Sequence, residues 1–161
     1  YTVSNELVLP NDTNMLNTLM GGRMMYLMDV IAAIAAKKHS QRVVVTASMD
    51  NLNFAKAISL GSTVSLHAKV TRAFNSSMEV YVDVWIEDRQ SGERTKVNEG
   101  IYTFVAVDET GKPVPIPQIT PETALEKQRY EGALRRKQLS LVLAGKMQPK
   151  DATELKALFT A

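Results

Sequence analysis

Residues 24–36 form the most apolar stretch of this 161-residue chain, and they constrain its fold more than any other segment. Their thirteen positions are too few to cross a bilayer, for which about 20 residues are needed. Two glycines precede the stretch and basic residues follow it, which places positive charge at the negative end of a helix dipole. The sequence therefore predicts a helix over residues 22–39. Because this helix is apolar on almost all sides, we expect it to be enclosed.

Several later segments are rich in β-branched and aromatic residues, and they predict strands over residues 43–54, 63–74, 78–87 and 96–107. Residues 3–9 predict one further short strand. Only short turn signals separate the four later segments, and such connections are too short for parallel crossovers. Together these elements predict an α+β fold, in which an antiparallel sheet of five or six strands wraps around one long central helix.

The last part of the chain has a different character. A proline-rich stretch predicts an extended exit from the sheet, so we divide the chain into a domain of residues 1–117 and a helical C-terminal extension of residues 118–161. Thr120, followed by proline, predicts the start of a charged helix that Gly145 ends. A last helix is expected over residues 151–159.

The composition excludes several classes of protein. The chain has no cysteine and only two histidines, His39 and His67, so it offers no disulfide, no thiol chemistry and no zinc cluster. The formal net charge is +2, and apart from a cluster near Arg135 the basic residues are spread along the chain, which gives no signal for nucleic acid or a membrane as a partner. No secretory signal pattern is present, so a cytoplasmic location is expected.

Asp29 is the only charged residue within the apolar stretch. An ionised carboxylate in such surroundings is costly unless it is paired or functional. One interpretation makes Asp29 a structural carboxylate that faces a polar gap, and the other makes it a general base or nucleophile. The residue pattern leaves both open, but a polar run before the helix offers a neutral amide, Asn14, as a companion.

Five short motifs carry a resemblance to a known family. In chain order they are LPNDTN at 9–14, TLMGG at 18–22, LMD at 27–29, VVTASMD with NF at 44–54, and YTFVAVD at 102–108. Their order and spacing resemble those of the bacterial hotdog acyl-CoA hydrolases, including the YciA-like and cytosolic acyl-CoA hydrolase group. The resemblance covers about residues 7–117, and it implies a hotdog acyl-CoA hydrolase domain followed by the helical extension.

The resemblance implies that the protein hydrolyses a fatty acyl-CoA to a free fatty acid and CoA. It makes Asp29 the catalytic carboxylate, Asn14 the amide that assists it, and Thr46 a third polar group of the site. Taken alone, Asn14 also fits an ordinary turn and Thr46 an ordinary strand. No cofactor or metal is expected, because CoA is part of the substrate and of the product.

Thioester hydrolysis requires an attacking group and donors for the negative charge that grows on the carbonyl oxygen. Asp29 supplies the first, as a nucleophile or, as we favour, by activating water. The N–H of Gly22 at the start of a helix is a natural oxyanion donor. Glycine at this point, and at Gly21 before it, lets the thioester approach the backbone closely.

For the CoA moiety the resemblance points to Lys56 and to the turn of Asn75, Ser76 and Ser77, whose ammonium, amide and hydroxyl groups suit phosphates and pantetheine. Each of these residues is equally well explained as ordinary surface. The basic run that begins at Arg135 would reach the 3′-phosphate only if the extension folded over the site, and a solvated helix face explains it better.

The resemblance also implies a homodimer, commonly within a trimer of dimers, so we expect a homohexamer. A sheet wrapped around one helix leaves an edge and a face to cover, which agrees with such an assembly. Gly22 and Asp29 are separated by about 10 Å along one helix, so one thioester cannot reach both. The base and the oxyanion donor should therefore come from different chains, with Asn14 accompanying Gly22.

Two other functions fit part of the pattern. A hotdog hydratase relies on a histidine in or near the central helix, but His39 lies at the end of the predicted helix and His67 in a strand. A non-catalytic acyl-CoA sensor would lack the carboxylate of Asp29 and would add a DNA-binding segment, and no helix-turn-helix precedes the domain.

The chain departs from the residues that are usual in the family at Asn17, Met20, Leu27, Ala57 and Ser62. These departures leave the proposed chemistry intact and leave the preferred acyl-chain length open.

Overall fold

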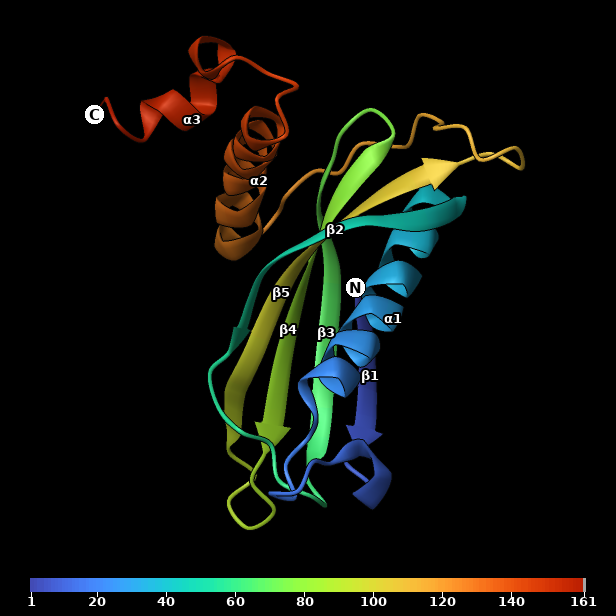
Figure 1. Cartoon of the computed structure of the whole chain (residues 1–161), viewed down its shortest axis with the longest axis vertical. Coiled ribbons are helices and arrows are strands. Elements are labelled where there is room, and N and C mark those ends of the chain that lie inside the picture. The colour runs from blue at the N-terminus through green and yellow to red at the C-terminus, as the bar shows by residue number, and fades with distance from the viewer. Residues whose placement is uncertain (161) are drawn as a thin grey trace. The chain divides into compact units, whose positions relative to one another are not determined.

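A computed structural model describes residues 1–160, which divide into two compact units (Figure 1). The first unit is Tyr1–Gln118 and the second begins at Ile119. The elements of the first unit are, in chain order, β1 (Thr2–Leu7), a 3-10 turn (Pro10–Asp12), α1 (Gly21–Ser40), β2 (Val43–Phe54), β3 (Thr63–Ala73), β4 (Ser77–Glu87) and β5 (Arg94–Val107).

The five strands form one antiparallel sheet in the order β1-β3-β4-β5-β2. α1 lies against one face of the sheet and contacts every strand (Figure 1). The predicted α+β architecture, an antiparallel sheet around one long helix, is thereby confirmed.

The core lies between α1 and the sheet. Alternate residues of β4, such as Val82 and Val84, are fully buried, because successive side chains of a strand point to opposite faces of the sheet. α1 approaches the sheet closely here, and its residue Met28 has an exposed fraction of 0%. Gly100 of β5 makes this close approach possible, since a Cβ there would lie only 2.8 Å from Met28 Cε.

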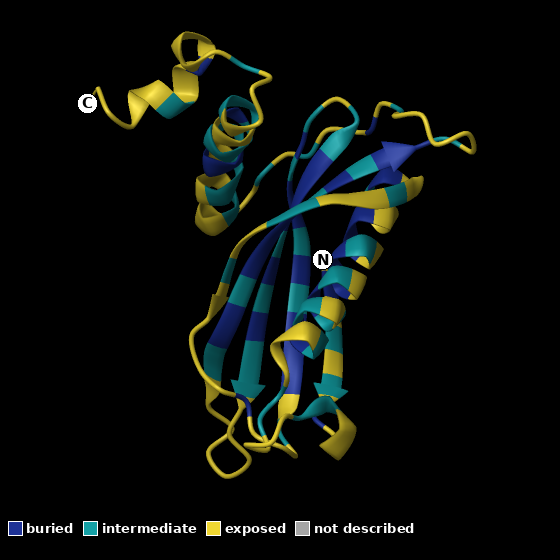
Figure 2. Cartoon of the chain, viewed as in Figure 1, coloured by how far each residue is buried: buried dark blue, intermediate teal, exposed yellow. Residues whose placement is uncertain are grey.

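One side of α1 is not enclosed, which corrects the expectation from the sequence. Figure 2 shows exposed positions along one side of α1. Tyr26, Val30 and Ile34 recur every four residues there and are 58%, 40% and 42% exposed. The expectation was wrong because an apolar helix face looks the same in sequence whether its own sheet covers it or it stays open in the isolated chain.

Among the described residues β2 pairs only with β5, so it is an edge strand whose other edge is open. Tyr26, Val30 and Ile34 are exposed on α1, which lies on one side of the sheet. Together with the open edge of β2 they form what we call the α1–β2 face. An open strand edge beside exposed apolar side chains is a surface suited to pairing with another chain.

The second unit contains α2 (Ala124–Leu143), a 3-10 turn (Pro149–Asp151) and α3 (Thr153–Ala157). α2 begins after Thr123 rather than after Thr120, because Thr123 and Glu126 form a capping box in which Thr123 Oγ1 accepts the Glu126 N–H at 3.1 Å. Gly145, with φ of +72°, follows the end of α2 as expected. α3 is shorter than the predicted helix over residues 151–159.

No helix within residues 1–160 is both long enough and apolar enough to cross a membrane.

Candidate active site

Asp29 lies in the middle of α1 and meets Thr46 on β2. Thr46 Oγ1 donates a hydrogen bond of 3.0 Å to Asp29 Oδ1. Thr46 is the only hydrogen-bond donor to the Asp29 carboxylate among the described residues, and Asp29 is half-buried. The carboxylate is therefore held from the side of its own sheet, while its second oxygen stays available to a ligand or to water.

Tyr102 of β5 lies beneath this turn of α1, and the sequence analysis did not assign it to the site. Its side chain is 1% exposed, and its hydroxyl lies 3.5 Å from the carbonyl oxygen of Met25. Burial, and after it the negative charge of Asp29, raise the pKa of Tyr102 well above its ordinary value. Tyr102 therefore stays neutral near pH 7 and adds no charge beside the carboxylate.

Asn14 organises the loop that leads into α1. Its Oδ1 accepts the backbone N–H groups of Leu16 at 2.9 Å and Thr18 at 3.2 Å, and its Nδ2 donates to Thr18 Oγ1 at 2.9 Å. The amide is thus fixed in one orientation, and within the described chain its second N–H has no partner. Asn14 can donate that N–H to a carbonyl oxygen or to water.

The start of α1 presents free backbone donors. The N-cap residue Met20 supplies no side-chain acceptor, and the first turn has no acidic residue. Gly22 is exposed, and no atom lies within 4 Å of the place where its Cβ would be. A carbonyl oxygen can therefore approach the positive end of this helix without steric obstruction.

These residues form two clusters within one chain. The helix-start cluster consists of Asn14, Gly21 and Gly22 and offers N–H donors. The carboxylate cluster consists of Asp29 and Thr46 and offers a base. Gly22 and Asp29 are about 10 Å apart along the axis of α1, so each cluster supplies one half of the chemistry that thioester hydrolysis requires.

The residues predicted to bind CoA also fall into two places. Lys56 follows β2, whose last residue Phe54 pairs with Asn98, and Asn98 pairs with Val84 of β4. The predicted turn ends at Ser77, where β4 begins. The strand from residue 77 to residue 84 spans about 23 Å. Lys56 and the turn therefore lie at opposite ends of the sheet in one chain.

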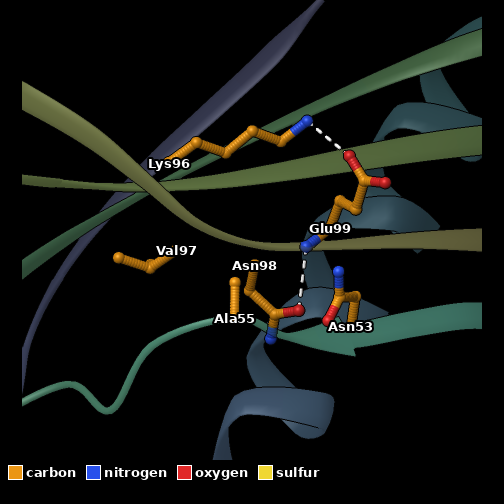
Figure 3. Close-up of a pocket in the computed structure, with 6 residues that line it drawn as sticks. All are labelled: Asn53, Ala55, Lys96, Val97, Asn98 and Glu99. Carbon is orange, nitrogen blue, oxygen red and sulfur yellow. Dashed lines mark hydrogen bonds and ion pairs between the residues drawn. The ribbon is translucent and has the colours of Figure 1, made fainter.

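A shallow cavity of about 190 Å³ opens at the end of the sheet where β2 separates from β5. Its lining residues are Asn53, Ala55, Lys96, Val97, Asn98 and Glu99 (Figure 3). Lys96 makes ion pairs with Asp83 at 2.7 Å and with Glu99 at 2.5 Å. Its ammonium is already neutralised, so the cavity offers amide groups rather than a free cation.

Neither histidine lies in the carboxylate cluster. His39 lies ten residues beyond Asp29 on α1, and its Nε2 is 2.7 Å from the carbonyl oxygen of Pro117. His67 of β3 is 2.9 Å from Ser65 Oγ and also contacts Arg94 and Tyr1. Burial and the Arg94 charge lower the pKa of His67, against a smaller opposite effect of Asp83. Both histidines have structural partners.

Comparison with known proteins shows clear relatives. The profile of the thioesterase superfamily matches residues 16–93. The chain is 45% identical over 134 residues to an uncharacterised acyl-CoA thioester hydrolase of Bacillus subtilis, a match that covers 83% of this chain and 78% of that protein.

Solved structures agree with this match. A hexameric acyl-CoA thioesterase has a TM-score of 0.85 and 45% identity, and the match covers 89% of this chain and 92% of that one. An acyl-CoA hydrolase of Staphylococcus aureus in complex with butyryl coenzyme A and coenzyme A has a TM-score of 0.83 and 38% identity, covering 97% of this chain and 94% of that one. Structures of the S. aureus enzyme also exist in which one asparagine, one aspartate or one threonine is replaced by alanine.

Proposed function

Because this chain belongs to the hotdog-fold acyl-CoA thioester hydrolases of the thioesterase superfamily, we propose that it cleaves its substrate at a site shared between two subunits. Asp29 and Thr46 act from one subunit, and Asn14 and Gly22 act from the other. The observation that carries the proposal is the separation of the base from the oxyanion donor by about 10 Å along α1, when one reacting carbonyl needs both within about 3 Å.

The choice of residues is supported by the S. aureus enzyme. Its altered asparagine, aspartate and threonine follow one another at intervals of 15 and 17 residues. Asn14, Asp29 and Thr46 have the same residue types in the same order at the same intervals.

In the proposed mechanism Asp29 accepts a proton from water as the water oxygen attacks the thioester carbon. The negative charge that develops on the carbonyl oxygen is stabilised by the N–H of Gly22 and the free amide N–H of Asn14, both from the partner subunit. When the tetrahedral intermediate collapses, the carbon–sulfur bond breaks and the leaving thiolate takes the proton. Thr46 holds Asp29 in place, and the products are a free fatty acid and CoA. The mechanism uses no cofactor.

The surface that brings two subunits together is the α1–β2 face. A two-fold axis beside β2 would place two copies of α1 antiparallel, so that the helix start of one lies beside the middle of the other. The same axis brings opposite ends of the two sheets together, which allows Lys56 of one subunit and the Ser77 turn of another to contact one CoA. We propose a dimer as the catalytic unit and a trimer of dimers as the full assembly, in a cytoplasmic location.

The proposal is tested by measuring thiol release from acyl-CoA substrates with Asp29→Asn, a change that keeps the shape of the side chain and removes its basicity. We expect turnover to fall by about two to four orders of magnitude while the binding of CoA is retained. Wild-type-like turnover of this variant would contradict the role of Asp29.

A further inference from the structure

Several apolar side chains at the start of α1 and in the loop before it are exposed in the single chain. Met15 is 100% exposed and Leu16 is 82% exposed. Met20, the N-cap residue of α1, is 40% exposed. Phe54, at the end of β2, is 52% exposed, and its ring lies 3.6 Å from the position of a Cβ on Gly21. We call Met15, Leu16, Met20 and Phe54 the apolar rim.

The loop fixes this exposure. The hydrogen bonds of the Asn14 amide close the turn, and the backbone N–H of Asn14 donates to Thr18 at 2.9 Å. Asn17 takes a left-handed conformation with φ of +56°, and its carbonyl accepts the N–H of Leu60 at 2.9 Å. A loop held at so many points keeps Met15 and Leu16 outside the core of their own chain, where an apolar ligand can contact them.

The surroundings of the rim suit an alkyl chain. Residues 13–22 contain no charged side chain. The cavity at the end of β2 is a poorer alternative, because the ion-paired Lys96 and Glu99 line it. The exposed residues of the α1–β2 face are already assigned to the second subunit.

We propose that the apolar rim is the wall of the acyl-chain site, and that Met15 and Leu16 determine which chain lengths are accepted. The inference rests on the proposed function, in which Asn14 and Gly22 hold the thioester carbonyl. The alkyl chain begins at that same carbonyl carbon, and Met15 directly follows Asn14. The subunit that supplies the oxyanion donors therefore also supplies the wall. The alkyl chain of the substrate covers the exposed side chains of the apolar rim.

The first test compares two substrates in Leu16→Ser. We expect kcat/KM for dodecanoyl-CoA to fall about tenfold, and kcat/KM for acetyl-CoA, whose chain is too short to lie along the rim, to stay near that of the wild type. Leu143→Ser is the matched control, because Leu143 is 79% exposed but lies in the second unit. It should change neither value, and light scattering should give the wild-type mass for both variants.

An equal loss for both substrates, no loss for either, or a lower mass of Leu16→Ser would overturn the acyl wall. The same assay separates this failure from that of the proposed function. If the wild-type protein released no thiol from either substrate, the proposed function would be wrong; if it did and Leu16→Ser had no chain-length effect, only the wall would be wrong.

A second test locates the wall within the dimer. A hybrid of one Asn14→Ala chain and one Asp29→Ala chain should keep one complete site, built from Asn14 of the second chain and Asp29 of the first. Adding Leu16→Ser to the Asp29→Ala chain should shift the chain-length preference of this site. Adding it to the Asn14→Ala chain should not. The reverse result would place the wall on the subunit of the base and contradict the inference.

Discussion

The inner and outer faces of α1 have similar composition but differ in how far they are buried. Met28 and Ile31, on the inner face, are 0% and 1% exposed, whereas Val30 and Ile34, on the outer face, are 40% and 42% exposed. The inner face stabilises the fold of one chain, and in our account the outer face stabilises the contact between two. Asp29 lies between these faces, where its own sheet can hold it and a second subunit can reach it.

A substitution on the outer face of α1 should have the largest effect on assembly and activity. Ile34→Glu would place an unpaired carboxylate in the contact between subunits, at a cost of about 3–5 kcal/mol. Because the proposed site needs two chains, assembly and activity should be lost together while the chain stays folded. Light scattering, circular dichroism and thiol release measure the three properties. Leu143→Glu, on the second unit, is the control. A dissociated Ile34→Glu chain that remained fully active would show that one chain contains the whole site.

The inner face should affect folding instead. Met28→Ala removes a fully buried side chain next to Gly100, and we expect the free energy of unfolding to fall by about 2–4 kcal/mol. Urea titration measures this change. At temperatures where the variant stays folded, its mass should equal that of the wild type. Dissociation of a folded variant would mean that the two faces of α1 do not act separately.

Between the faces, Thr46→Val removes the hydroxyl that holds Asp29 and keeps the shape of the side chain. Loss of one hydrogen bond to a charged group is worth about 1.5–3 kcal/mol, so kcat should fall by about tenfold or more, with assembly and unfolding midpoint little changed. Thr46→Ser, which keeps the hydroxyl, should restore most of the activity. If Thr46→Ser were as slow as Thr46→Val, the hydrogen bond would not be the cause.

His67 lies on the face of the sheet that points away from α1, so it belongs to neither face of that helix. Replacing it should have the smallest effect of these changes. The pKa of His67 is lowered in the folded chain, so the unfolded chain binds more protons near and below the ordinary pKa of histidine. The contribution of His67 to stability is therefore present above about pH 6.5 and is lost as the pH falls through its lower folded value. His67→Gln should flatten the decline of unfolding free energy in this range without changing kcat at pH 7.5.

Much of the fold follows from patterns that the physics of each element imposes. The alternation of Val80, Val82 and Val84 predicts a strand with one buried face, and the apolar run predicts α1. Asp29 is a candidate site residue because an ionised carboxylate in that apolar run is costly unless it is paired or functional. These predictions succeed because burial depends on periodicity, which a single sequence displays.

Other features depend on information that a sequence does not display. Alternation predicts that Tyr102 faces the core, but not that Asp29 lies above it. The register of the sheet, which separates Lys56 from Ser77, is set by strand pairing and not by composition. At the start of α2 two capping signals overlap, and the capping box at Thr123 prevails because it satisfies two backbone donors instead of one.

The central claim is that the site is shared between two subunits. The most direct test is the activity of the hybrid of one Asn14→Ala chain and one Asp29→Ala chain, without Leu16→Ser. The Asn14→Ala and Asp29→Ala chains are each expected to be inactive alone, and any disturbance of the loop by Asn14→Ala stays at the dead site of a mixed pair. After subunit exchange, activity should return to at most about a quarter of the wild-type value, because half of random pairs are mixed and each has one intact site of two. If verified hybrids are as inactive as their parents, both groups act within one chain and the account is wrong.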